Sequence, residues 1–110
     1  MPKVAAVFAT MNRSATAVAC VRALAAQTRP PEIVVVADNV STDETVAELK
    51  GLQGLPFRLF VHRMNDNRGN AGGVQEAMDL AFAEGVDAVW ILDDDSWPRP
   101  NALASLVKEP

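Results

Sequence analysis

Short apolar stretches rich in valine and isoleucine recur along the chain and predict four β-strands. They occupy residues 4–9, 33–37, 57–62 and 86–92. Continuous apolar runs of about 4–8 residues are typical of strands that are covered on both faces, as in a parallel sheet. The first and fourth runs are almost entirely apolar, so we expect both strands in the centre of the sheet.

The segments between these strands carry the apolar spacing of helices with one buried face. The clearest example is the third segment, whose regularly spaced apolar residues are Val74, Ala77, Met78, Ala81 and Phe82. Gly85 follows this pattern and supplies a helix stop, because glycine readily adopts the left-handed conformation that ends many helices.

Three more helices are predicted from start and stop signals. The first covers about residues 15–27 and ends before Pro30, which cannot continue a helix. The second begins at Ser41, because Glu44 three residues later completes the pattern of a capping box. A short last helix begins at Asn101.

The alternation of strands and helices predicts an α/β fold, a Rossmann-like parallel sheet of about four strands with flanking helices. In the usual strand order 3-2-1-4, the first and fourth strands are neighbours, and ligands bind beyond their carboxyl ends. Those ends are residues 10–13 and 93–95. We therefore expect the binding site there, within one domain that spans residues 1–110.

Composition narrows the class of protein. With 110 residues, 49% hydrophobic and 22% charged, the chain has the make-up of a folded globular domain. A formal net charge of -4 argues against a nucleic-acid-binding surface. The single cysteine, Cys20, cannot form an internal disulfide, and no signal peptide or run of about 20 apolar residues is present. We expect a cytoplasmic protein without a membrane span.

Three consecutive carboxylates, Asp93, Asp94 and Asp95, directly follow the last apolar run. Their mutual repulsion would be relieved by a cation, and side chains alternate in direction, so Asp93 and Asp95 can reach one ion. Carboxylate oxygens favour Mg²⁺ or Mn²⁺. The alternative is a solvated turn capped by Asp95 or Ser96, but three charges exceed what a turn requires.

Polar residues also follow the second strand. Asp38 can accept an N–H from a nucleobase, whereas Ser41 and Asp43 serve equally well as turn or cap residues. The stretch 65–73, NDNRGNAGG, would let backbone amides approach an anion, with Arg68 as a charged clamp. It matches neither dinucleotide-binding nor P-loop patterns, and a plain glycine-rich helix entrance is the alternative.

Three single residues have more than one interpretation. His62, the only histidine, could act as a general base, but a satisfied strand histidine is the commoner case. Cys20 fits a small core residue better than a nucleophile, because nothing nearby in sequence lowers its pKa. Trp97 either lines the ligand pocket or covers the end of the sheet.

Four sequence strings, taken in this order and spacing, resemble family 2 glycosyltransferases. They are VAAVFATMNR, IVVVADNVSTDET, NRGNAGG and VWILDDDSWPRP, and the match that they make in this order extends over nearly the whole chain. The resemblance implies the nucleotide-binding half of a GT-A fold. The string DDDSWP is similar to the branch that acts on galactofuranose or rhamnose donors.

The resemblance also implies roles for individual residues. The first string would contact the base and ribose, Asp38 would bind a uracil or thymine ring, and Asp94 would contact sugar or ribose. The implied donor-binding residues are Thr10, Asn12, Arg13, Asp38, Arg68, Asn70, Gly72, Gly73 and Asp94. Asp93 and Asp95 would hold Mn²⁺ or Mg²⁺ on the diphosphate. Met11 and Val40 depart from the family pattern, which commonly has tyrosine and glycine there.

The implied function is binding of a UDP- or dTDP-linked sugar for transfer to a polysaccharide or lipid-linked acceptor. The general base of an inverting enzyme would lie beyond Pro110, so we expect little activity from this chain alone. The full-length protein would sit in the cytoplasm, peripheral to the inner face of the membrane.

Three other classes of protein are compared with the sequence. Phosphatase and receiver folds need acidic residues directly after the first strand, where this chain has Thr10, Met11 and Asn12. A non-catalytic nucleotide- and metal-binding module would keep Asp38 and the acidic cluster without an acceptor half. An assembly module, forming a homo-oligomer through an open edge of the fourth strand, is a third alternative.

Overall fold

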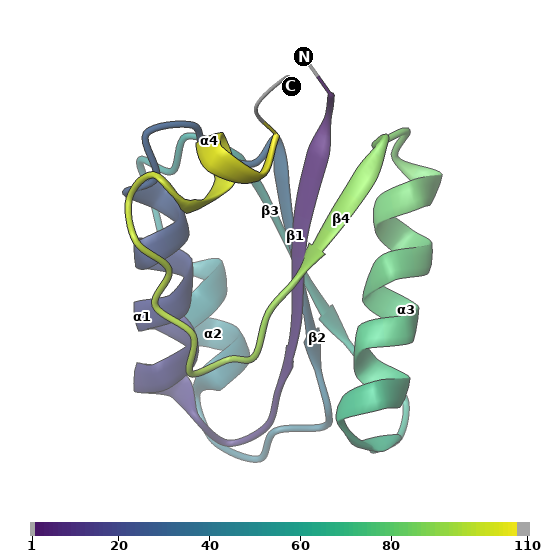
Figure 1. Cartoon of the computed structure of the whole chain (residues 1–110). Coiled ribbons are helices and arrows are strands. Elements are labelled where there is room, and N and C mark those ends of the chain that lie inside the picture. The colour runs from purple at the N-terminus through teal and green to yellow at the C-terminus, as the bar shows by residue number, and fades with distance from the viewer. Residues whose placement is uncertain (1, 108–110) are drawn as a thin grey trace.

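The computed structural model describes residues 2–107, in which strands and helices alternate along the chain (Figure 1). In chain order the elements are β1 (Val4–Thr10), α1 (Ser14–Ala25), β2 (Ile33–Asp38), α2 (Thr45–Lys50), β3 (Arg58–Arg63), α3 (Gly69–Ala83), β4 (Ala88–Ile91) and α4 (Ala102–Leu106). None of the helices within residues 2–107 has the length and apolar character needed to cross a membrane.

The strands form one parallel sheet in the order β3-β2-β1-β4. This confirms the α/β class and the expected order. The expectation that the fourth strand is central was wrong: β4 pairs only with β1 within the described residues, and its Ala88 and Ile91 are exposed. An apolar run is typical of a covered strand, but it fixes neither the number of strands that pair with it nor, as β4 shows, its burial.

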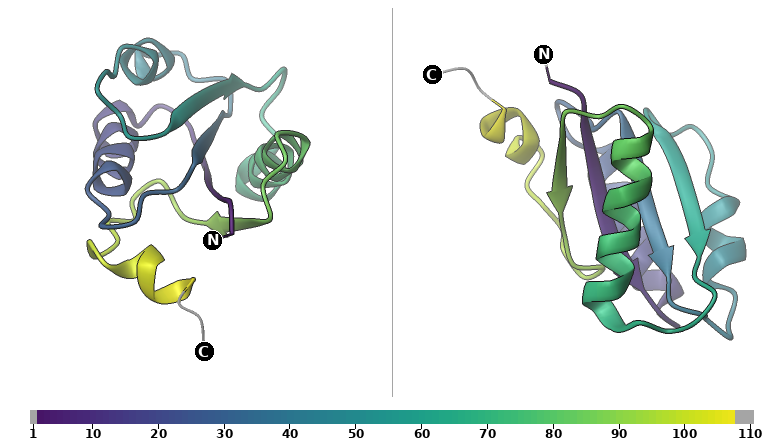
Figure 2. Two further views of the ribbon diagram at one scale, coloured as in Figure 1. Left: turned by 90° about the horizontal axis from the view of Figure 1, so that it is seen from above. Right: turned by 90° about the vertical axis from the view of Figure 1, so that its right-hand side faces the viewer.

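Helices cover both faces of the sheet, with α1 and α2 on one side and α3 on the other (Figures 1 and 2). Alternate residues of β1 pack on the two sides of the sheet. Ala5, Val7 and Ala9 belong to the core beneath α3, and Ala6 and Phe8 belong to the core beneath α1 and α2. Because successive side chains of a strand point to opposite faces, one buried strand supplies both cores.

The start of α2 differs from the predicted capping box. The helix begins at Thr45, whose backbone N–H donates to the Asp43 carboxylate at 2.9 Å. The Ser41 hydroxyl instead donates to Asp38 at 2.5 Å, and no side chain caps the helix at Glu44. The Ser41 oxygen accepts the Asn12 N–H at 2.9 Å, so it does not serve as the acceptor of a capping box.

The glycines of the stretch 65–73 do not precede α3, because the helix starts at Gly69 and includes Gly72 and Gly73. At the other end Gly85 has a φ of 87° directly after the C-cap, Glu84. The predicted helix stop is confirmed, since this left-handed conformation costs glycine little.

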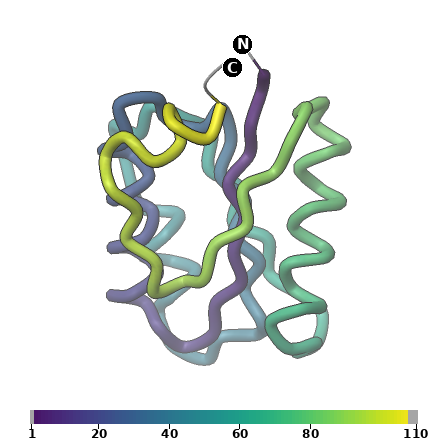
Figure 3. Tube along the Cα trace, in the orientation of Figure 1, coloured from purple at the N-terminus to yellow at the C-terminus, as the bar shows by residue number. Residues whose placement is uncertain are grey.

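After β4 the chain passes alongside α1 before forming α4 (Figure 3). The side chain of Gln27, just beyond the end of α1, clamps this segment. It donates to the Arg99 carbonyl at 2.7 Å and accepts the Leu103 N–H at 3.0 Å. The Thr28 N–H adds a bond of 2.7 Å to the Pro100 carbonyl. The acidic residues therefore lie between two anchored points, β4 and this clamp.

Candidate functional site

A cleft of about 290 Å³ lies at the carboxyl ends of β1, β2 and β4. Its lining comes from the loops after these strands, together with the loop before α3. The lining residues are Ala9, Thr10, Met11, Arg13, Asn39, Asn67, Gly69, Asn70 and Asp94. Four of the expected donor-binding residues are among them: Thr10, Arg13, Asn70 and Asp94. This is the edge of the sheet at which α/β folds bind ligands.

Asp94 joins the ends of β4 and β1 across the cleft. Its carboxylate accepts the Thr10 hydroxyl at 2.9 Å and the Arg13 guanidinium at 3.0 Å. Asp94 is 7% exposed, whereas the Arg13 side chain is half exposed. Burying a carboxylate costs least when both oxygens are hydrogen-bonded and a cation lies beside it. Asp94 is therefore fixed in place, and Arg13 still presents part of its guanidinium to solvent.

Asp93 and Asp95 are exposed on either side of buried Asp94. Ser96 closes the turn, because its hydroxyl accepts the Asp93 N–H at 3.2 Å and its own N–H donates to the Asp93 carbonyl at 3.0 Å. Within residues 2–107, no group of three or more metal-binding side chains could hold an ion. Mg²⁺ sites commonly combine one or two carboxylates with phosphate oxygens and water. Asp93 and Asp95 are the exposed carboxylates of this turn that could contribute to such a site.

Cys20 packs behind the acidic turn, with its Sγ 3.8 Å from the Asp93 carbonyl oxygen. Burial raises the pKa of this thiol to about 12, and the charges of Asp94 and Asp95 add to the effect. Each of these causes disfavours the thiolate. Cys20 is thus a protonated core residue, in agreement with the sequence-based prediction.

Asp38 is completely buried and does not line the cleft. One of its oxygens accepts the Ser41 N–H at 2.9 Å, and the other accepts the Ser41 hydroxyl at 2.5 Å. The Arg63 guanidinium lies 4.0 Å away and donates to the Ser41 carbonyl at 3.0 Å. The buried carboxylate therefore takes both of its hydrogen bonds from Ser41, in the loop that follows β2.

Asn12 connects that loop to the loop after β1. Its N–H donates to the Ser41 hydroxyl at 2.9 Å. Its side-chain oxygen accepts the Thr42 N–H at 2.7 Å and the Asp43 N–H at 3.3 Å. Asn12 has a φ of 51°, in the left-handed region that asparagine tolerates better than most residues. It is exposed but is not part of the cleft lining.

Arg68 lies outside the cleft lining. Its guanidinium donates to Asp66 at 3.0 Å and to Glu76 of α3 at 3.5 Å. Glu76 also pairs with His62 of β3. His62 is thus a satisfied strand histidine, away from the cleft, as the commoner interpretation predicted.

Gly72 and Gly73 allow close packing at the start of α3. A Cβ on Gly73 would lie 2.9 Å from the Ala9 Cβ and 3.0 Å from the Asn39 Nδ2. A Cβ on Gly72 would lie 2.4 Å from the Arg68 Cβ. Neither glycine lines the cleft. Packing of the helix on the sheet explains Gly73, and the close approach of the Arg68 side chain explains Gly72.

Sequence reasoning did not select Asn39 and Asn67 as site residues, although both line the cleft. The Asn39 amide donates to the Gly69 carbonyl at 3.0 Å and accepts the Arg68 N–H at 3.4 Å. The signal for Asn39 in the sequence was its position directly after Asp38 at the end of a strand, because neighbouring side chains of a strand point in different directions.

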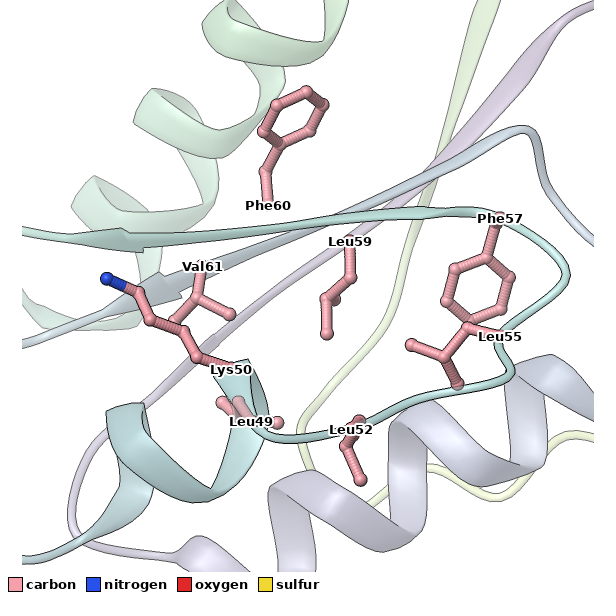
Figure 4. A pocket seen from close by; sticks show the side chains of 8 residues that line it. All are labelled: Leu49, Lys50, Leu52, Leu55, Phe57, Leu59, Phe60 and Val61. Carbon is pink, nitrogen blue, oxygen red and sulfur yellow. The ribbon is translucent and has the colours of Figure 1, made fainter.

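A second cavity, of about 400 Å³, lies between α2 and β3 (Figure 4). Except for Lys50, the residues that line it have apolar side chains: Leu49, Lys50, Leu52, Leu55, Phe57, Leu59, Phe60 and Val61. It contains a single charged side chain and none of the residues that end β1 or β4. The smaller cleft, with its converging polar groups, is therefore the candidate site. Trp97 lines neither cavity and is 62% exposed.

The sequence model of "Glycosyl transferase family 2" matches residues 6–109. Galactofuranosyltransferase GlfT1 of Mycolicibacterium smegmatis is 34% identical over 102 residues, which cover 93% of this chain and 33% of that protein. Its counterpart in Mycobacterium tuberculosis is 38% identical over 86 residues, covering 76% of this chain and 28% of that protein. The chain spans about a third of the length of these curated relatives.

Solved structures show the same architecture. S. aureus TarS 1-349 in complex with UDP-GlcNAc superposes with a TM-score of 0.79 at 23% identity, covering 94% of this chain and 30% of that one. The mannosyltransferase PcManGT of Pyrobaculum calidifontis, in complex with GDP-Man and Mn2+, gives 0.79 at 26% identity, covering 96% and 31%. These similarities confirm the expected GT-A type of α/β fold.

Proposed function

The chain belongs to glycosyl transferase family 2, and from that premise we propose that it binds a nucleotide-diphospho-sugar together with a divalent metal. The observation that carries the proposal is the cleft at the ends of β1 and β4, with the exposed carboxylates of Asp93 and Asp95 beside buried Asp94. Two free carboxylates and a half-exposed arginine next to a polar cleft suit a diphosphate and its cation.

In this proposal Asp93 and Asp95 bind Mn²⁺ or Mg²⁺, and Arg13 faces the diphosphate. When bound, the metal would act as a Lewis acid that stabilises the departing nucleoside diphosphate. Asp94 keeps Arg13 and Thr10 in place through its two hydrogen bonds. Asn70 and Gly69, at the start of α3, add polar groups on the opposite wall of the cleft.

The proposed reaction is direct displacement, in which an acceptor hydroxyl attacks the anomeric carbon and the nucleoside diphosphate leaves. A carboxylate general base would accept the proton from that hydroxyl. We assign this role to no side chain within residues 2–107, so donor binding is the property proposed for this part of the protein.

The similarity to two galactofuranosyltransferases supports a donor of the galactofuranose class, and we propose UDP as its carrier. We further propose a polysaccharide or lipid-linked acceptor and a location on the cytoplasmic side of a membrane. A dTDP-linked sugar is the alternative donor, because uracil and thymine present the same N3–H and carbonyl groups to a protein.

Calorimetric titration of UDP and dTDP, with and without Mn²⁺, tests the donor site. We expect Mn²⁺-dependent binding that falls by at least about tenfold in the double variant Asp93→Asn with Asp95→Asn. The matched control is Asp79→Asn with Asp87→Asn, which removes two exposed charges from α3 and from the loop before β4. Binding that is absent in the wild type, or equally weakened in both double variants, would refute the proposal.

A further inference from the structure

Gln27 is a buried amide that uses both of its polar groups on one segment far away in the chain. It directly follows Ala26, the C-cap of α1, and is 5% exposed. Its Nε2 donates to the Arg99 carbonyl at 2.7 Å and lies 3.5 Å from the Pro98 carbonyl. Its Oε1 accepts the Leu103 N–H at 3.0 Å. These bonds fix the backbone of the segment, because breaking either one would leave a buried polar group without a partner.

The segment that Gln27 holds is the direct continuation of the acidic turn. Ser96 closes this turn, since its N–H donates to the Asp93 carbonyl at 3.0 Å. A single residue separates Ser96 from Pro98, where the contacts with Gln27 begin. The backbone is therefore fixed only a few residues beyond Asp95.

Two prolines make the connection between the turn and Gln27 stiff. The rings of Pro98 and Pro100 fix their own φ angles, and each proline also restricts the residue before it, here Trp97 and Arg99. Residues 97–100 therefore all have reduced backbone freedom. A stretch of this kind transmits a fixed position to its neighbours, whereas a flexible linker would absorb the constraint.

The side-chain bonds of the turn itself leave its second half to this connection. Asp94 bonds to Thr10 and Arg13 through its carboxylate. Within residues 2–107, no hydrogen bond involves Asp95. Its position is thus determined by its chain neighbours, Asp94 on one side and Ser96 on the other.

The end of α1 and the residues after it support the whole segment from one side (Figure 1). The Cys20 Sγ lies 3.8 Å from the Asp93 carbonyl oxygen, at the start of the turn. Gln27 holds the chain beyond the turn, and the Thr28 N–H adds its bond of 2.7 Å to the Pro100 carbonyl. The acidic turn therefore lies between two contacts with the same rigid element.

We propose that Gln27 is a positioning residue for the divalent metal, which acts through residues 97–100 to keep the carboxylates of Asp93 and Asp95 together beside the cleft. The inference rests on the proposed function, in which these two carboxylates bind Mn²⁺ or Mg²⁺. Gln27 does not line the cleft. Its effect is to order the turn before the cation arrives, which lowers the entropic cost of binding.

A clamp that only stabilises the fold gives a different result. Its loss would lower the free energy of unfolding, but the folded protein would bind metal and nucleotide as before. The quantity that separates the two roles is the factor by which Mn²⁺ tightens UDP binding. This factor is the ratio of the dissociation constants of UDP without and with Mn²⁺, and calorimetry on the folded protein measures both.

Two variants remove the positioning effect in different ways. Gln27→Met keeps an unbranched side chain of similar length and removes both polar groups. The double variant Pro98→Gly with Pro100→Gly leaves Gln27 and the backbone carbonyls in place and makes only the connection flexible. We expect each variant to lower the Mn²⁺ factor by at least about fivefold, the order of the cost of ordering one long side chain on binding. The proline variant keeps the proposal testable if Gln27→Met does not fold.

Two matched controls separate positioning from a general loss of stability. Gln75→Met makes the same substitution on the exposed face of α3. Ile33→Val removes one methyl group from the core beneath α3, away from the acidic turn, and destabilises the fold mildly. Both controls should leave the Mn²⁺ factor within about twofold of the wild type.

Hydrogen exchange of the Ser96 amide examines the turn without any ligand. This N–H is bonded to the Asp93 carbonyl, so its exchange reports opening of the turn. We expect it to exchange severalfold faster in Gln27→Met and in the proline variant than in the wild type. The Ala77 amide, in the middle of α3, is the internal reference for global opening.

An unchanged Mn²⁺ factor in Gln27→Met would overturn the positioning role, and so would an equal fall in either control. A fall in Gln27→Met without one in the proline variant would also overturn it, because the effect would not pass through residues 97–100. A wild type whose UDP binding does not depend on Mn²⁺ would remove the proposed function of the turn and this role with it. Ser96 exchange distinguishes the two failures, because it shows whether Gln27 orders the turn even when no metal binds.

Discussion

Replacing Gly73 by alanine tests how closely α3 packs on the sheet. The new Cβ would lie 2.9 Å from the Ala9 Cβ and 3.0 Å from the Asn39 Nδ2. The Ala9 Cβ is fixed by the backbone of β1 and cannot rotate away. Asn39 could move only by giving up its bond to the Gly69 carbonyl. Relief therefore requires a shift of the helix.

Two effects of opposite sign determine the change in the free energy of unfolding. Alanine is favoured over glycine inside a helix by about 1 kcal/mol. Overpacking a well-packed contact typically costs about 1–3 kcal/mol. Because both close contacts are to atoms with little freedom, we expect the second effect to dominate. The net result is a destabilisation of about 1 kcal/mol, which lowers the melting temperature by roughly 4 °C.

Urea unfolding followed by tryptophan fluorescence measures this change. Gly51→Ala is the matched control, because a Cβ there meets only ordinary contacts of 3.4 and 3.5 Å and φ is -79°. We expect the control to unfold at the same or a higher urea concentration than the wild type. A Gly73→Ala variant at least as stable as the wild type, with an unchanged m-value, would refute the packing argument.

Three further predictions concern the cleft and its supports. Arg13→Gln removes the cation 3.0 Å from Asp94, so binding of Mn²⁺ alone should become severalfold tighter while UDP binding weakens. Calorimetry measures the two dissociation constants, and a change of both in the same direction would contradict the reasoning. Gln27→Leu leaves the Leu103 N–H without its partner, and we expect a loss of about 1–3 kcal/mol in urea unfolding. Cys20 should resist thiol reagents at pH 8 while folded, because its pKa is about 12, and react once unfolded.

The Cys20 thiol also predicts a pH dependence of stability. Its pKa is raised in the folded state, so the unfolded chain loses the proton first as pH rises. The contribution of the Cys20 thiol to the free energy of unfolding is complete below about pH 9 and is lost between about pH 9 and 12. Cys20→Val should flatten this part of the stability profile, and an unchanged slope would contradict it.

For Gln27→Leu the control is Gln75→Leu, on the exposed surface of α3.

The sequence by itself determined the strands, their order and the edge of the sheet that carries the polar residues. Apolar runs and helical spacing are local properties, and the right-handed connection rule leaves few topologies to choose from. For the same reason the acidic residues 93–95 could be assigned to the carboxyl end of β4, next to the end of β1, before any contact was known.

Only the tertiary structure decided which polar groups become partners. Ser41 has the sequence position of a helix cap, yet its hydroxyl bonds to buried Asp38. Arg68 has the position of a phosphate clamp, yet it pairs with Asp66 and Glu76. A hydroxyl or guanidinium has several acceptors within reach along the chain, and local spacing does not rank them.

The physical reason is that partner choice depends on burial and on residues far apart in the chain. Asp94 bonds to Thr10 across 84 positions, and the desolvation of that carboxylate makes the bond obligatory. Packing is equally non-local: Gly73 faces Ala9 from a helix more than 60 positions away. Sequence patterns place such residues on the correct edge or face, and the folded chain alone determines what each of them touches.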